Sequence, residues 1–165
     1  MHTRIVKPKR GPTLLVRPLR RGDTDTVSAM FERLGDRSRR TRFNGPKPRL
    51  STRDLEQLAA TADPNHHVLV AYVEGDPRPA ALARLIRDGQ SAEIAFEVAD
   101  ELQHRGIGSA LTAELIADAR AAGITEITAL VASENSAAVA LLRRILNVLD
   151  IRYEGPEISI RAALT

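Results

Sequence analysis

The residues whose types and spacing best fit a chemical role lie between Gln103 and Gly108. A strand-like run from Glu93 to Val98 precedes them, and a helical pattern follows as far as Ala122. The first backbone N–H groups of a helix have no partner within the helix, and the helix dipole adds positive potential there. Glycines at positions 106 and 108 remove the Cβ atoms that would keep a bulky anion away from those groups. The stretch therefore predicts a binding site for a pyrophosphate.

The spacing of the glycines narrows the identity of this pyrophosphate. A P-loop needs a lysine beside its last glycine, and none is near; a dinucleotide fingerprint needs a third glycine where Leu111 stands. The motif Gln103-x-x-Gly106-x-Gly108, at a helix start and after a strand that ends in valine, resembles the acetyl-CoA motif of the GCN5-related N-acetyltransferase (GNAT) family. The alternative is an ordinary strand–turn–helix whose glycines serve tight packing.

The resemblance implies acetyl-CoA as the cosubstrate and assigns its contacts. In this family two central strands splay apart, and the backbone of the first strand, here at Phe96 and Val98, pairs with the pantetheine arm. A backbone N–H in that strand could polarise the acetyl carbonyl, as an oxyanion hole does. The pyrophosphate contacts are expected from Gln103 and from the N–H groups of the loop, which are those of His104, Arg105, Gly106, Ile107, Gly108 and Ser109.

The strand before the loop also offers two carboxylates. Glu93 and Glu97 lie on the same face of that strand, because side chains alternate between the two faces. Buried carboxylates are costly without partners, so two of them on a central strand suggest a role. Glu93, ten residues before Gln103, resembles the glutamate base of the family's protein-lysine acetyltransferases, and Glu97 is a second candidate. The alternative is an ion pair between Glu93 and Arg84 across the sheet.

The helix that follows Asn135 departs from the family pattern. Many members carry N-x-x-A-x-x-L-Y here, and Leu142 stands at the tyrosine position. This puts a tyrosine general acid in doubt, because Tyr72 and Tyr153 fall in strand-like runs that suggest packing roles. Water or the product ammonium could instead protonate the thiolate. Asn135 matches the family asparagine that contacts CoA or the substrate, and it can also act as a helix N-cap.

The elements that must position these residues follow in a clear order. Apolar periodicity, capping residues and Gly or Pro turns predict one β-α-α-β-β-β-α-β-α-β-β domain over residues 13–165, after a flexible basic arm at 1–12. This order matches the GNAT fold over about residues 13–162. The expected fold class is thus α/β (α+β): a mixed, mostly antiparallel sheet, splayed at the acetyl-CoA site and flanked by about four helices. Residues 38–50 are expected to form a loop because of their Asn-Gly-Pro and Pro content.

Composition limits the other classes of function. The chain has 165 residues and no cysteine, which excludes disulfides, thiolate metal sites and a cysteine nucleophile. No apolar run is long enough to span a membrane, and the basic N-terminus lacks the apolar stretch of a signal peptide, so a cytoplasmic location is expected. The family resemblance further implies a bacterial-type enzyme. No metal site is expected either, because His66 and His67 have no evident third ligand.

The charge of the chain is uneven and bears on the acceptor. Residues 1–53 hold 15 Lys or Arg against 4 Asp or Glu, whereas residues 54–165 hold 9 against 17. In the family the first helices form one wall of the acceptor cleft, so Arg39, Arg40, Arg42 and Phe43 are expected to contact the substrate. A basic wall would repel a small cationic amine and attract a lysine with acidic neighbours. The segment 38–51, with the helix expected after it, also resembles the corresponding segment of bacterial protein-lysine acetyltransferases. A protein lysine is therefore the expected acceptor.

Two other functions stay open at this point. The chain could acetylate a small amine such as a polyamine, an amino acid or an antibiotic, or it could be a non-catalytic acyl-CoA-binding or nucleic-acid-binding module. Nucleic acid is disfavoured because Phe43 is the only aromatic residue in the basic loop. A homodimer is left open. In the protein-lysine subgroup the catalytic domain is often attached to a nucleotide-binding or synthetase-like domain. No such domain is expected here, so regulation through it is expected to be absent or to come from elsewhere.

Overall fold

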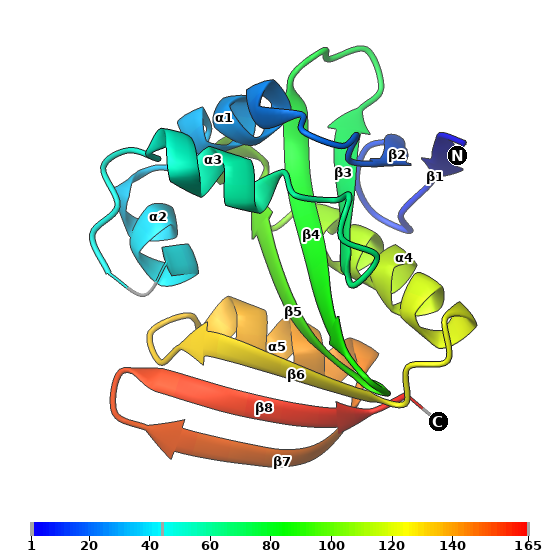
Figure 1. Cartoon of the computed structure of the whole chain (residues 1–165), viewed down its shortest axis with the longest axis vertical. Helices are drawn as coiled ribbons and strands as arrows, with labels where there is room; N and C mark the ends of the chain where they lie inside the picture. Colours follow the sequence, from blue (N-terminus) through cyan, green and yellow to red (C-terminus); the bar gives the residue numbers. More distant parts are fainter. Residues whose placement is uncertain (1, 44, 165) are drawn as a thin grey trace.

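A computed structural model describes residues 2–43 and 45–164 of the chain (Figure 1). Its strands form one mixed sheet in the order β1-β2-β3-β4-β5-β6-β8-β7. In chain order the elements are β1 (Arg4–Val6), β2 (Leu14–Pro18), α1 (Thr24–Glu32), α2 (Asp36–Phe43), α3 (Thr52–Leu58), β3 (His66–Val73), β4 (Pro79–Asp88), β5 (Ser91–Val98), the 3₁₀ turn η1 (Asp100–Leu102), α4 (Ile107–Ala121), β6 (Glu126–Ala132), α5 (Ser136–Ile145), β7 (Asn147–Glu154) and β8 (Glu157–Ala163). The mixed, mostly antiparallel sheet expected from the sequence is confirmed.

The sheet divides into two parts that meet along a short seam. Neighbouring strands from β1 to β5 pair antiparallel, as do β6, β8 and β7. Between the two parts, β5 and β6 pair parallel, and only from Ser91 to Glu93 against Glu126 to Thr128. Beyond Glu93 the two strands diverge, as their ribbons show in Figure 1. The splay expected from the family resemblance is therefore present, and it begins at Glu93.

Residues 4–6, which were expected to belong to a flexible arm, form an edge strand instead. β1 pairs antiparallel with β2 over three residues. Arg4 holds it further, because its guanidinium donates to Glu114 at 3.0 Å and to Asp118 at 2.8 Å on α4. These partners lie more than 100 residues away in sequence, so the local pattern could not reveal the strand.

The segment 36–43, of which residues 38–43 were expected to be loop, forms helix α2. The helix has no apolar face and buries no side chain, which is why hydrophobic periodicity missed it. Its charges suit the helix dipole, with Asp36 in the first turn and Arg40 and Arg42 in the last. Two contacts fix it to α1: the Phe43 ring lies edge-on at 5.9 Å from the Phe31 ring, and Arg39 lies over Phe31 at 4.0 Å.

Two apolar cores lie on opposite faces of the sheet. One packs α1 and α3 against Val68, Val70 and Leu82, and the other packs α4 and α5 against residues such as Ile94. Because β5 alternates, Ile94, Phe96 and Val98 face the α4 side, and Glu93 and Glu97 face the side of α1 to α3. No helix in the described residues is long and apolar enough to cross a membrane.

Candidate active site

The opening between β5 and β6 is lined by an unpaired edge of β5. In the described residues, the backbone from Ile94 to Val98 has a partner strand only on its β4 side. A cavity of about 940 Å³ follows this edge and reaches both the N-terminus of α4 and the β6–α5 junction. An extended chain can add to such an edge as a further strand. The backbone at Phe96 and Val98 lies on this open edge, which is what pairing with a pantetheine arm would require.

The N-terminus of α4 lines this cavity and has no capping side chain. Its N-cap is Gly106, with a φ of +81° and no side chain to accept from the helix. The N–H groups of Ile107, Gly108 and Ser109 therefore have no partner inside the helix, and no acidic residue stands in the first turn. His104 is left-handed as well, with a φ of +63°, so the loop bends sharply before the helix begins. Dipole and free N–H groups together favour an anion here.

The two motif glycines also make room for neighbouring parts of the protein. A Cβ on Gly106 would lie 2.8 Å from the backbone oxygen of Arg10, which belongs to the N-terminal segment. A Cβ on Gly108 would lie 3.3 Å from a Val98 methyl group and 3.4 Å from a Leu141 methyl group. Tight packing, the alternative left open by the sequence, therefore applies to both glycines, and it coexists with an exposed helix N-terminus.

Several basic side chains line the cavity beside this loop. Arg105 comes from the loop itself, Arg10 from the N-terminal segment and Arg144 from α5. Arg144 donates to the hydroxyl of Ser109 and so links α5 to the first turn of α4. Ile107, by contrast, is 1% exposed, so only its backbone is available to a ligand. These cations suit the phosphates of CoA, and the sequence pattern had singled out only Arg105 among them.

Gln103 ties the loop to β5 and to α2. Its amide nitrogen lies 3.2 Å from the backbone oxygen of Val98, 3.1 Å from the Ser38 hydroxyl and 3.4 Å from the Asp100 carboxylate. The other oxygen of Asp100 accepts from the backbone N–H of Gly35 at 3.0 Å. Gln103 lines the cavity as expected, but its amide group already serves to hold β5, α2 and the loop together.

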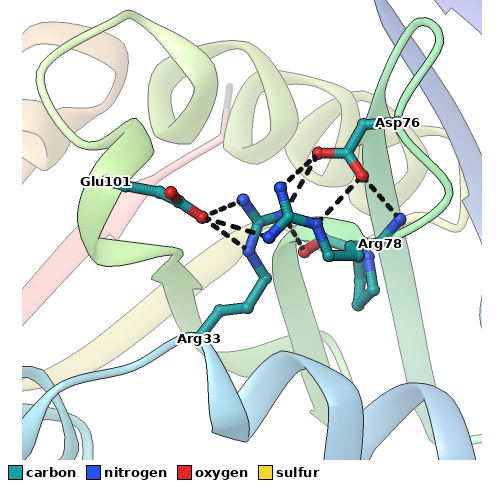
Figure 2. A network of polar contacts seen from close by, with 5 residues as sticks. Arg33, Asp76, Arg78 and Glu101 are labelled. Atoms are coloured by element: carbon teal, nitrogen blue, oxygen red, sulfur yellow. Dashed lines mark hydrogen bonds and ion pairs between the residues drawn. The ribbon is translucent and has the colours of Figure 1, made fainter.

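A network of four charged side chains holds η1, the 3₁₀ turn that precedes the Gln103 loop. Figure 2 shows Arg33 and Arg78 lying between the carboxylates of Asp76 and Glu101. Arg33 also donates to the backbone oxygen of Pro79 at 3.0 Å, and the hydrogen bonds from Arg78 lower the pKa of Asp76 to about 2. The network joins the end of α1, the β3–β4 turn and η1. It therefore holds the segment that leads into α4 against the end of α1.

Glu93 lies where the two strands separate. It is the last residue of β5 that pairs with β6, and its side chain is exposed. It lines the large cavity and also a smaller one of about 360 Å³ beneath α2 and α3. The expected alternative, an ion pair with Arg84, is wrong, since no such pair occurs among the described residues and Arg84 has other partners.

Glu97 is occupied by a neighbour on α2. Its carboxylate lies 3.2 Å from Arg42, with side-chain exposures of 9% and 17%. The distance is that of an ion pair, but the angle excludes a hydrogen bond, so this carboxylate oxygen is buried without a donor among the described residues. Glu97 is thus engaged by Arg42 and largely covered, whereas Glu93 is exposed and open to an incoming amine.

Arg84 occupies the floor of the smaller cavity. It is 6% exposed, and it donates to the backbone oxygen of Leu58 at 3.1 Å and lies 3.2 Å from Nε2 of His66. Burial, together with nearby Arg42, lowers the pKa of Arg84 to about 10, and Glu97 only partly opposes this. The sequence had considered His66 only as a possible metal ligand and Arg84 only as a partner of Glu93.

The residues expected to contact the acceptor divide into two groups. Arg40 is exposed and has no described side-chain partner, and Phe43 and Arg42 line the smaller cavity. Arg39 is instead structural: it lies over Phe31 and donates to the backbone oxygens of Phe31 and Pro48 at 3.1 and 3.0 Å. It therefore holds the loop after α2 and has little left to offer a substrate.

The β6–α5 junction holds Asn135 but no tyrosine. Asn135 caps α5 by accepting from the N–H of Ala138 at 3.2 Å, and it lines the large cavity, so both expected roles are compatible. Leu142 is fully buried in the core. Tyr72 accepts from Arg17 at 2.8 Å, Tyr153 is 70% exposed on β7, and neither lines a cavity described here. In the described residues no tyrosine is placed to serve as a general acid.

Comparison with known proteins agrees with this geometry. Residues 31–147 match the family model for the acetyltransferase (GNAT) family. Acetyltransferase Pat of Mycolicibacterium smegmatis is 32% identical over 145 residues, which are 85% of this chain and 43% of that protein. The chain thus spans less than half the length of this curated relative.

Solved structures show the same fold. The GNAT domain of S. lividans PAT has a TM-score of 0.87 at 27% identity, covering 98% of this chain and 96% of that one. The spermidine N-acetyltransferase of Vibrio cholerae, solved with CoA and spermine, has a TM-score of 0.69 at 21% identity over 92% and 95% of the two chains, and shows the fold alone. With the splayed β5 edge and the uncapped α4 N-terminus, these matches establish that the chain belongs to the GNAT family and is an N-acetyltransferase domain that uses acetyl-CoA.

Proposed function

We propose that the domain transfers acetyl directly from acetyl-CoA to the side-chain amine of a protein lysine, with Glu93 as the general base. The observation that carries the mechanism is the position of Glu93, an exposed carboxylate at the start of the splay that lines both cavities. An amine entering from the smaller cavity would pass this carboxylate before it reaches the β5 edge. The resemblance of the α2–α3 segment to bacterial protein-lysine acetyltransferases supports the acceptor.

Each step has a group in the chain that suits it. Bound acetyl-CoA supplies an activated thioester, and the unpaired β5 backbone near Phe96 and Val98 can hold the arm and donate to the carbonyl oxygen. The pKa of a lysine amine is about 10.4, so the attacking amine must lose a proton, which Glu93 accepts directly or through water. The C–S bond then breaks and the sulfur leaves as a thiolate, which needs no tyrosine acid because the thiol has a pKa of about 8.5. Water can return the proton to the thiolate.

The first test compares Glu93→Gln with Glu97→Gln. The Glu93 substitution should lower kcat by about 10²–10⁴, the usual share of a general base, with little change in acetyl-CoA affinity by calorimetry. Glu97→Gln should act mainly on stability, because it leaves Arg42 buried without its carboxylate, a loss of about 3 kcal/mol by urea unfolding. A kcat defect that follows Glu97 and spares Glu93 would reverse the assignment.

The acceptor side is basic, which favours an acidic protein surface. Arg37, Arg40 and Arg49 are exposed around α2 and have no described partner among carboxylates. Like charges at 4 Å repel by about 1 kcal/mol in water and by several times more near a protein surface. A free polyamine would meet this repulsion, whereas a lysine flanked by Asp or Glu would not. Affinity for the protein substrate should therefore fall as salt rises.

The second test measures CoA release with acidic proteins and with small amines. Charge reversal at Arg40 and Arg49 should raise KM for a protein substrate and leave KM for acetyl-CoA nearly unchanged. Arg39 is excluded from the variant because its loss would disturb the fold. Turnover of a free polyamine at a salt-independent KM, with none on any protein, would replace the protein acceptor by a small molecule.

A further inference from the structure

We infer that the cavity beneath α2 and α3 is a subsite for a carboxylate carried by the acceptor, with Arg84 as the group that binds it. The cavity measures about 360 Å³, and both Arg84 and Glu93 line it. The inference rests on the proposed function, because it places the acceptor on this side of the sheet. It adds a specific recognition element to that function: a negative charge close to the target amine.

Arg84 is a buried cation that lacks a counter-ion. No carboxylate lies within ion-pair distance of its guanidinium in residues 2–43 and 45–164, and its described partners are one backbone oxygen and one imidazole, both on Nη1. Nε and Nη2 have no described protein partner. An arginine buried without an anion is costly, and the lowered pKa of Arg84 reflects that environment. A ligand carboxylate would supply the missing charge and could bond two guanidinium donors at once.

His66 holds the guanidinium in place. Its Nδ1 lies 3.1 Å from the backbone oxygen of Ala60, which can only accept, so Nδ1 carries the proton. Nε2 is then free to accept from Arg84 at 3.2 Å. Burial, and then the nearby Arg84, lower the pKa of His66, which keeps the imidazole neutral and suited to this role. One edge of the guanidinium is thus fixed to the protein, and the other edge is left for a ligand.

The neighbouring carboxylates are already committed. Asp54 accepts from Lys47 at 3.1 Å and takes part in the cap of α3. Glu97 pairs with Arg42. The charges cancel within each pair. Glu93, the third carboxylate that lines this cavity, is assigned to the target amine, so Arg84 remains as a positive charge without a carboxylate partner. The local charge balance therefore favours an anionic ligand group over a second amine.

Strand register sets the distance between the two groups that would contact the acceptor. Arg84 on β4 faces Ala95 on β5, two residues from Glu93 and on the same side of the sheet. Diagonal neighbours of this kind are about 7–8 Å apart. A lysine amine at Glu93 and a carboxylate at Arg84 would therefore be bound by neighbouring positions on the same face of the sheet. A flanking Asp or Glu on a protein could supply such a carboxylate, and so could the α-carboxylate of free lysine.

The test is a double-mutant cycle between enzyme and substrate. Paired peptides would carry the target lysine next to Glu or to Gln, and enzymes would be wild type, Arg84→Met and Arg84→Lys. We expect wild type to favour the Glu peptide by about tenfold or more in kcat/KM, the size of a charge-assisted hydrogen bond. Arg84→Met should abolish most of that preference, and Arg84→Lys should restore part of it. Arg152→Met is the matched control, because Arg152 is exposed on β7 and lines neither cavity, so the preference should survive its loss.

The outcomes separate this inference from the proposed function. If wild type acetylates both peptides equally, the subsite is refuted while the protein acceptor stands, and this holds even if Arg84→Met fails to fold. If peptides are not acetylated but free lysine is, with the same dependence on Arg84, the carboxylate subsite stands and the protein acceptor falls. Circular dichroism and acetyl-CoA binding of each variant show whether a loss of preference arises from misfolding.

Discussion

Replacing Gly106 by alanine probes the junction between the cofactor loop and the N-terminal segment. Gly106 has a φ of +81°, and alanine in that region is strained by about 1–2 kcal/mol. The new Cβ would also lie 2.8 Å from the backbone oxygen of Arg10, a contact that no side-chain rotation can relieve. Overpacking of this kind adds about 1–3 kcal/mol. We therefore expect Gly106→Ala to destabilise the domain by about 3 kcal/mol in total.

Gly123 provides a matched control at the other end of the same helix. Its φ is also +81°, but a Cβ there would meet no atom within 4 Å. Gly123→Ala carries the same backbone strain and the same change in the unfolded chain, so the difference between the two variants isolates the contact with Arg10. We expect that difference to be about 2 kcal/mol, or about 4–8 °C in Tm for a domain of this size.

The assay is urea unfolding of both variants, together with acetyl-CoA titration by calorimetry. Gly106→Ala should also weaken acetyl-CoA binding, because the loop must move away from the N-terminal segment, while Gly123→Ala should bind normally. Equal losses of stability would refute the reasoning, since they would mean that the N-terminal segment does not press on the loop. Normal acetyl-CoA affinity in Gly106→Ala would refute the link between that contact and the cofactor site.

Two further predictions concern pH. Because burial and Arg84 lower the pKa of His66, the folded state disfavours its protonation, so stability should decrease as pH falls below about 6.5, the ordinary histidine value. His66→Gln should remove this dependence, and an unchanged slope between pH 7.5 and 5.5 would contradict the role given to the imidazole. At Asp118, burial raises the pKa, but hydrogen bonds from Arg4 and His67 outweigh it, so the net pKa is lowered. Wild type should therefore exceed Asp118→Asn in stability at pH 7, and the gap should close as pH falls below about 4, through the lowered pKa; a gap that stays constant with pH would argue against it.

Much of the cofactor side could be predicted because its signals are local. Glycine spacing, the cap at Asn135 and the helical period after Gly106 act over a few residues, and the observed α4, β6 and α5 agree with them. The alternation of β5 also placed Glu93 and Glu97 on one face. These features depend on backbone sterics and on the alternation of side chains along a strand, both of which follow from the order of neighbouring residues.

The acceptor side was decided by tertiary structure. Strand register and helix placement bring Glu97 next to Arg42, 55 positions away, and Arg84 next to His66. The sequence alone had also allowed a pair between Arg84 and Glu93. Helix α2 has no apolar face, so its existence depends on contacts with α1 and on the charges of its two ends. The partner of a charge is set by which distant strands and helices meet, because Coulomb interactions act through space and carry no period along the chain. The sequence by itself thus determined the glycine loop and the helix start that are proposed to hold acetyl-CoA, and only the fold determined which charges pair on the proposed acceptor side.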